Sequence, residues 1–216
     1  MNCGEDTADR KKRRNGKEKI MKIAIDIDDT LTRIDRAAAV EKYIKENGLS
    51  FRIVDPHAHT LLDVCDWSRD DVARFIKSGG DKLFLNAPLR EGAKETVEKW
   101  KAAGHEIIIL TARISEWFQD PVNKSRRQLD EYKIPYDEVV AEVWEKGRYC
   151  RDRGIEVLIE DNFEICKKAQ ELGVKAVMFV DKHNFAHAKE IKYAGPNWEY
   201  VASSVEFILN PPRERG

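Results

Sequence analysis

The sequence predicts an α/β fold with three layers, a Rossmann-like parallel sheet between two layers of helices, together with a small inserted helical cap. From residue 21 onward, short apolar runs alternate with amphipathic helical stretches, which is the pattern of a parallel sheet covered on both faces. Nearly every apolar run is followed by polar side chains. In an open α/β sheet such positions meet at the carboxyl ends of the strands, where ligands bind.

The predicted strands are short, continuously apolar runs, as expected of strands that are buried on both faces. They cover residues 23–27, 107–110, 157–159 and 176–180, with a less apolar fifth strand at 136–140. The polar groups at their ends are Asp26 and Asp28, Thr111, Glu160 with Asp161, and Asp181. The edge of the sheet that gathers these groups is therefore the predicted site.

Helices connect the predicted strands, and two of them end at glycines. Residues 91–103 are followed by Gly104, and residues 162–172 are followed by Gly173. Glycine readily adopts the left-handed conformation that often closes a helix. These two segments are therefore the clearest predicted core helices.

Residues 33–86 separate the first strand from the next core helix and have helical patterns of their own. One helix covers 35–47, and another begins after Ser68, with Asp71 as the second member of a capping box. We interpret this insertion as a small helical cap over the active edge of the sheet. The predicted organisation is a basic tail at 1–20, a core at 21–32 and 87–210, a cap at 33–86 and a C-terminal tail at 211–216.

The composition argues against several classes of function. Lys and Arg number 38 and Asp and Glu 39, so the net charge of -1 gives no overall attraction to nucleic acid or to an anionic membrane. No apolar run approaches the roughly 18 residues of a membrane helix. The four scattered cysteines include no CxxC pair and indicate free thiols, so we expect a cytoplasmic protein.

The first 20 residues contain the basic run 10–14 and almost no large apolar side chain. This composition predicts a disordered tail, and a nuclear-import or nucleic-acid patch is the alternative. Met21 directly precedes the first predicted strand, so we hypothesise that it is the effective start of the protein.

Three carboxylates crowd the segment that follows the first predicted strand: Asp26, Asp28 and Asp29. Like charges at this spacing disfavour joint ionisation unless a cation or a functional proton compensates them. The segment therefore indicates a metal site or an acid/base role. The alternative is a polar turn that caps the following helix.

Three later features suit phosphate chemistry. Thr111 closes an apolar strand and offers a hydroxyl and a backbone N–H to a phosphoryl oxygen, although helix capping would explain it equally well. Lys146 lies in a polar turn and suits the charge of a phosphoryl group, unless it is an ordinary surface lysine. Glu160 and Asp161 offer the hard oxygen ligands that Mg²⁺ prefers.

The order of these features is DxDxT, a strand-end threonine, a lysine and a strand-end acidic pair. It resembles the haloacid dehalogenase-like (HAD) phosphatases over about residues 21–202. The resemblance implies that Asp26 is the nucleophile that becomes aspartyl-phosphate, and that Asp28 protonates the leaving oxygen and then activates water. A covalent intermediate replaces one difficult displacement by two easier ones.

The same resemblance implies a site for Mg²⁺ and for the phosphoryl group. The implied residues are Asp26, the main-chain carbonyl of Asp28, and Asp161 as metal ligands; Thr111, Ala112 and Lys146 at the phosphoryl group; and Thr30 and Glu160 in support.

A narrower resemblance is to the 5′(3′)-deoxyribonucleotidases and their bacterial relatives. It is based on residues 88–93, 111–113, 158–162 and 183–184. The chain departs from the pattern at Glu160, where an aspartate is usual. The resemblance implies a 5′-nucleotidase acting on nucleoside monophosphates, and a sugar phosphate or a phosphoamino acid is the alternative substrate. A second copy of the chain is a further candidate partner.

Other interpretations stay open. Trp67, Phe75 and Phe84 either stack on a nucleotide base or pack in a core. A catalytically silent phosphate-binding protein of the same fold would have the same sequence pattern. A receiver-like signalling domain also places acids, a threonine and a lysine at strand ends, but its accepting aspartate would end a strand before Thr111.

Two pairs of histidines are candidate transition-metal ligands. His57 and His59 share one face if extended, and His183 and His187 lie one helical turn apart. Neither pair has a third nitrogen or sulfur ligand at a suitable spacing. The sequence therefore predicts no transition-metal site.

Overall fold

The computed structural model describes residues 20–211, and the remainder of both predicted tails lies outside the described residues. The described chain forms a parallel sheet of six strands in the order β3-β2-β1-β4-β5-β6, which confirms the predicted fold class. The strands are β1 (Lys22–Ile25), β2 (Glu106–Leu110), β3 (Glu138–Val140), β4 (Val157–Glu160), β5 (Lys175–Phe179) and β6 (Tyr193–Gly195). No helix between residues 20 and 211 is long and apolar enough to cross a membrane.

The first strand occupies the centre of the sheet. Ile23 of β1 pairs with Ile107 of β2 on one side and with Val157 of β4 on the other. β1 ends at Ile25, two residues earlier than predicted, because the chain then enters a wide turn, η2 (Ile27–Leu31). The edge strand β6 was not predicted, since it has three residues and two of them are only half-buried.

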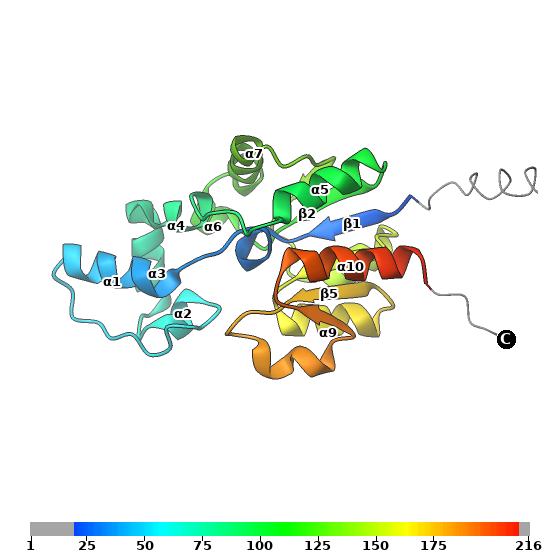
Figure 1. Cartoon of the computed structure of the whole chain (residues 1–216). Coiled ribbons are helices and arrows are strands. Elements are labelled where there is room, and N and C mark those ends of the chain that lie inside the picture. Colours follow the sequence, from blue (N-terminus) through cyan, green and yellow to red (C-terminus); the bar gives the residue numbers. More distant parts are fainter. Residues whose placement is uncertain (1–19, 212–216) are drawn as a thin grey trace, which may run out of the picture.

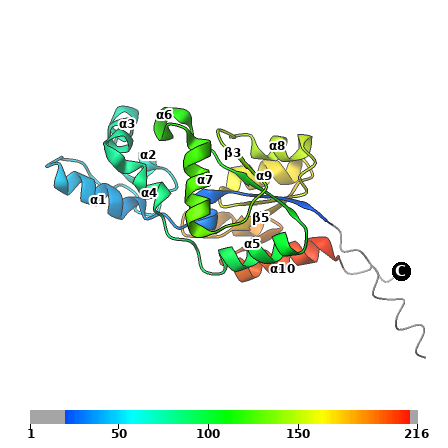
Figure 2. The same ribbon diagram turned by 90° about the horizontal axis from the view of Figure 1, so that it is seen from above.

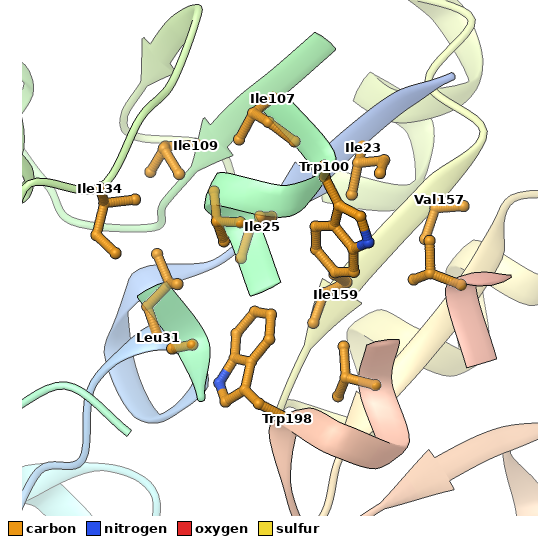
Figure 3. Close-up of a cluster of buried hydrophobic side chains, with 14 of the residues drawn as sticks. Ile23, Ile25, Leu31, Trp100, Ile107, Ile109, Ile134, Val157, Ile159 and Trp198 are labelled. Atoms are coloured by element: carbon orange, nitrogen blue, oxygen red, sulfur yellow. The ribbon is translucent and has the colours of Figure 1, made fainter. Parts of the chain in front are cut away.

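Helices cover both faces of the sheet (Figures 1 and 2). The first face is covered by α5 (Ala93–Ala102), α7 (Pro121–Tyr132) and α10 (Trp198–Leu209), and the second by α8 (Lys146–Asp152) and α9 (Phe163–Glu171). Successive residues of β1 point to opposite faces, as the pleat requires. Ile23 and Ile25 therefore join Trp100 and Trp198 on the first face (Figure 3), whereas Ala24 packs with the second.

A second group of short helices lies beyond the carboxyl ends of the strands (Figure 1). It consists of α1 (Arg36–Glu46), α2 (Leu61–Val64), α3 (Arg69–Phe75), η3 (Ile76–Gly80) and α4 (Lys82–Leu85). These helices have a hydrophobic cluster of their own, and the capping box of Ser68 and Asp71 is present at the start of α3. We call this group the helical layer.

Trp67 and Phe75 belong to the interior of the helical layer. Their ring centroids lie 5.3 Å apart, and both rings contact Tyr43 edge-on. Both side chains are buried. Of the two roles considered for them, core packing is the one that the structure supports.

Candidate active site

The polar residues at the ends of three strands meet at one edge of the sheet. The strand order places β1 between β2 and β4, so Asp26 lies between Thr111 and the pair Glu160 and Asp161. The Asp26 N–H donates to the Ile159 carbonyl at 3.0 Å, which continues the pairing of β1 with β4 by one residue. All four polar side chains are buried.

Lys146 connects two of these carboxylates. It is the first residue of α8, and its Nζ lies 2.5 Å from Asp26 Oδ1 and 2.5 Å from Glu160 Oε2. Lys146 is 2% exposed, so it is not the surface lysine that the sequence also allowed. A buried ammonium group needs such partners, since an unpaired buried charge is costly.

The pKa values of this triad reflect burial and charge together. Burial alone would lower the pKa of Lys146, but the charges of Asp26 and Glu160 outweigh it and hold that pKa above its ordinary value. Burial raises the pKa of Asp26 well above its usual range, and the charge of Lys146 opposes this effect. A further cation at the site would lower the pKa of Asp26 and favour its ionised form.

Gly147 allows Lys146 to reach this depth. A Cβ atom at Gly147 would lie 2.8 Å from Ala169 Cα on the neighbouring helix α9. Only glycine therefore permits the observed approach of α8 to α9.

The acidic edge can hold a magnesium ion. Asp26, Glu160 and Asp161 each offer an oxygen, and these atoms all lie within 4.8 Å of one another. Glu160 already accepts from Lys146 through Oε2 and from the N–H groups of Asp161 and Asn162 through Oε1. Asp26 and Asp161 are therefore the carboxylates that fit Mg²⁺, and Glu160 holds Lys146 in place.

Thr30 orients one of these carboxylates. Its Oγ1 donates to Asp161 Oδ1 at 3.2 Å, and its main-chain carbonyl accepts from the indole N–H of Trp198 at 3.1 Å. Trp198 is fully buried in the core of the sheet. Thr30 therefore links the acidic edge to the hydrophobic core.

Asp29 does not share the pocket of Asp26, although the two are three positions apart. Its φ of 62° is in the left-handed region, which aspartate tolerates better than most residues. The carboxylate pairs with Arg36 of α1 and accepts from the Ile34 N–H at 3.0 Å. The crowding of three acids in the sequence is thus relieved, because Asp29 faces the helical layer.

Asp28 is held by Arg113, for which the sequence predicted no role of its own. Arg113 Nε lies 2.9 Å from Asp28 Oδ2, and Nη2 lies 2.6 Å from Oδ1. Arg113 also donates to Ser125 Oγ at 3.1 Å, and its guanidinium lies 5.4 Å from the centre of the Phe118 ring. In the sequence, Arg113 is marked only by its place in the segment 111–113, two residues after Thr111.

Two histidines approach the outer oxygen of Asp161. His183 Nε2 lies 3.0 Å and His59 Nδ1 3.2 Å from Oδ2. Burial would raise the pKa of Asp161, but the histidine contacts outweigh it and hold that pKa well below its usual value. Burial would lower the pKa of His59, but the contact with Asp161 raises it to about 9.

A cavity of about 770 Å³ opens above these residues. Asp26, Asp28, Thr111, Ala112, Lys146 and Asp161 line its floor, together with the supporting Glu160. Arg36, His59 and Phe84 of the helical layer also line it, with Trp117 and Phe118 from the short helix α6 (Ser115–Phe118) after β2. This volume is within the range of small-molecule sites.

The fold was compared with known proteins. No family model matches the sequence, and no curated protein matches it by sequence. Among solved structures, a candidate phosphatase from Clostridium difficile has a TM-score of 0.62 at 17% identity and covers 89% of this chain and 100% of its own. A HAD family hydrolase from Deinococcus radiodurans, with bound phosphate and sodium, has a TM-score of 0.61 at 14% identity over 89% and 98% of the two chains.

The chain has the fold of the HAD hydrolases. A third structure with this HAD fold is a mutant form of CbbY from Rhodobacter sphaeroides in complex with xylulose 1,5-bisphosphate. Its TM-score is 0.53 at 14% identity, and it covers 83% of this chain and 95% of its own. At these identities the HAD likeness concerns the fold, so the roles of the site residues depend on their own chemistry.

Proposed function

We propose that this protein is a magnesium-dependent phosphatase that acts through an aspartyl-phosphate at Asp26. The observation that supports this most directly is the contact of Lys146 Nζ with Asp26 Oδ1. It holds one oxygen of a buried carboxylate, while no described residue forms a hydrogen bond with Oδ2. Oδ2 is then available to attack phosphorus or to bind the metal.

The proposed reaction has two displacements at phosphorus. In the first, an Asp26 oxygen forms a bond to phosphorus, the bond to the leaving oxygen breaks, and Asp28 gives that oxygen a proton. In the second, Asp28 takes a proton from water, the water oxygen forms a bond to phosphorus, the bond between Asp26 and phosphorus breaks, and inorganic phosphate leaves the regenerated Asp26 carboxylate. Thr111 and the adjacent backbone of Ala112 bind phosphoryl oxygens, and Lys146 offsets their charge.

The metal site would consist of Asp26, the Asp28 main-chain carbonyl and Asp161. When bound, Mg²⁺ neutralises phosphate charge and so makes an anionic substrate accessible to a carboxylate. Glu160 keeps Lys146 beside Asp26, and Thr30 fixes the rotation of Asp161. We propose that the helical layer, residues 33–86, acts as the cap that recognises the leaving group.

For the substrate we propose a nucleoside monophosphate. The lining of the cavity combines the proposed phosphate-binding groups with the aromatic rings of Phe84, Trp117 and Phe118, on which a base would stack. A sugar phosphate or a phosphoamino acid is the alternative. We also propose a reducing cytoplasm as the compartment, because Cys65, Cys150 and Cys166 are free and buried.

The decisive experiment measures phosphate release with Mg²⁺ for the wild type and Asp26→Asn. Its panel contains nucleoside monophosphates, sugar phosphates and phosphoamino acids. We expect the substitution to reduce kcat by about 10³-fold or more, and chelation to abolish activity until Mg²⁺ is restored. Undiminished turnover by Asp26→Asn would show that Asp26 is not the nucleophile. An inactive wild type would favour a phosphate-binding protein.

A further inference from the structure

The cluster of His59, Asp161 and His183 joins two parts of the fold. His59 belongs to the loop before α2 in the helical layer, and His183 to the loop after β5 in the core. Their ring centroids lie 5.1 Å apart. The two imidazole nitrogens and one Asp161 oxygen all lie within 4.8 Å of one another. The cluster combines one histidine from each of the two pairs that the sequence offered.

Both histidines make ion-pair contacts with Asp161 Oδ2, but the cluster is not completed by regular hydrogen bonds. Asp161 Oδ2 and His59 Nδ1 are buried, and neither has a hydrogen-bond partner among the residues that the structure describes. The Asn184 amide approaches His183 Nε2 at 3.3 Å, but it already donates to the carbonyls of Asp161 at 2.6 Å and Phe179 at 2.8 Å. An amide nitrogen has two hydrogens, so neither is left for His183 Nε2, which can then bind a metal ion in the tautomer that is protonated at Nδ1.

The spacing suits a small divalent ion. Two ligand atoms that are each about 2.1 Å from one ion lie about 3.0 Å apart at a right angle and about 3.4 Å apart at the tetrahedral angle. His183 Nε2 lies 3.0 Å from Asp161 Oδ2, which matches the right-angle value, and His59 Nδ1 lies 3.2 Å from it, which falls between the two values. Two imidazoles with one carboxylate favour a transition metal, whereas Mg²⁺ prefers oxygen ligands alone.

We infer that His59 Nδ1, His183 Nε2 and Asp161 Oδ2 bind a divalent transition-metal ion such as Zn²⁺, Mn²⁺ or Co²⁺. The site is separate from the Mg²⁺ site proposed at Asp26, and Asp161 serves both, since its Oδ1 faces Thr30 and its Oδ2 faces the histidines. The bound ion joins the His59 loop to the core and so holds the helical layer over the cavity. Its binding does not depend on phosphatase activity.

The test uses Co²⁺, whose visible absorption reports its ligands, added to the full chain in saturating Mg²⁺. We expect a saturable signal in the wild type and at least a ~10-fold weaker affinity in His59→Gln and in His183→Gln. The controls His57→Gln and His187→Gln alter exposed histidines outside the cluster and should bind Co²⁺ as the wild type does. Circular dichroism of each variant verifies that it is folded.

Asp26→Asn separates the two metal sites. It removes a carboxylate of the proposed Mg²⁺ site and should leave the Co²⁺ signal in place. The inference is overturned if wild type gives no Co²⁺ signal, if the two cluster variants bind as tightly as the controls, or if Asp26→Asn alone abolishes binding. None of these results affects the phosphatase proposal, which is decided by phosphate release in Mg²⁺ without Co²⁺.

Discussion

Arg113 contacts both carboxylate oxygens of Asp28, with its Nε 2.9 Å from Oδ2 and its Nη2 2.6 Å from Oδ1. This bidentate geometry is specific to a guanidinium, because a lysine ammonium has only one nitrogen to donate from. A general acid has to present a proton to the leaving oxygen. In the proposed mechanism, Asp28 exchanges this contact for one with the substrate, and Arg113 determines the position of Asp28 before that exchange.

Arg113→Lys tests this positioning role. The lysine keeps the positive charge but cannot form both hydrogen bonds to Asp28. We therefore expect kcat to fall about 10- to 100-fold while KM changes much less. The measurement is steady-state phosphate release on the best substrate. Arg153→Lys, at an exposed pair with Glu138, is the matched control. Equal kcat values in the two variants would show that Arg113 does not position Asp28.

Lys146→Met tests the buried charge triad. The change leaves Asp26 and Glu160 without their shared cation, and removal of one partner from a buried ion pair costs about 3–5 kcal/mol of unfolding free energy. Urea denaturation measures this loss. The double variant Lys146→Met with Glu160→Gln removes one of the two unpaired buried charges and should recover part of the lost unfolding free energy. A double variant less stable than the single one would contradict the charge explanation.

Trp198→Phe tests the link between the hydrophobic core and the acidic turn. It leaves the Thr30 carbonyl without its indole donor and opens a small void, so we expect a loss of about 2–3 kcal/mol in unfolding free energy. Trp144→Phe, at a side chain that is 62% exposed, should change stability by less than about 0.5 kcal/mol. Thermal and urea unfolding compare the two. Equal losses would disprove the special role of Trp198.

Asp137 provides a pH-dependent contribution to stability. Burial would raise the pKa of Asp137, but the Lys101 ammonium and the Ile107 N–H outweigh it and hold that pKa below its ordinary value. A lowered folded-state pKa means that the stabilisation is complete above the unfolded pKa of about 3.9 and disappears as the pH falls through the folded pKa.

Asp137→Asn should therefore reduce stability at pH 6–7, by about 1 kcal/mol or less because the site is partly open to solvent. The difference from the wild type should shrink progressively below about pH 4. Urea unfolding at a series of pH values measures it, with Asp152→Asn at an exposed pair as the control. A difference that grows as the pH falls would reverse the predicted sign.

The sheet could be predicted from the sequence because its central strands are buried on both faces. Ile107 to Leu110 form a continuous apolar run that is too short for a helix and rich in isoleucine, which favours a strand. The polar residues that follow them could be placed at one edge for the same reason. β6 escaped prediction because its three residues are too few to set a period and contact the sheet on one side only.

The pairings inside the site could not be predicted in this way. Arg113 and Asp28 lie 85 positions apart, and His59 reaches Asp161 from the helical layer. Such contacts depend on how loops fold back over the strand ends, which no local pattern records. The direction of Asp29 depends on a left-handed backbone at one residue, and aspartate permits that conformation without requiring it.

The turn at Ile27–Leu31 places neighbouring acids in different parts of the protein. Asp28 faces the cavity, whereas Asp29 is tied by Arg36 to the first helix of the helical layer. The backbone between them is one planar peptide unit. In the proposed mechanism, the contact of α1 with Asp29 and the proton donor Asp28 are therefore separated by one peptide unit, so the binding of a leaving group under the helices and the placement of Asp28 are coupled.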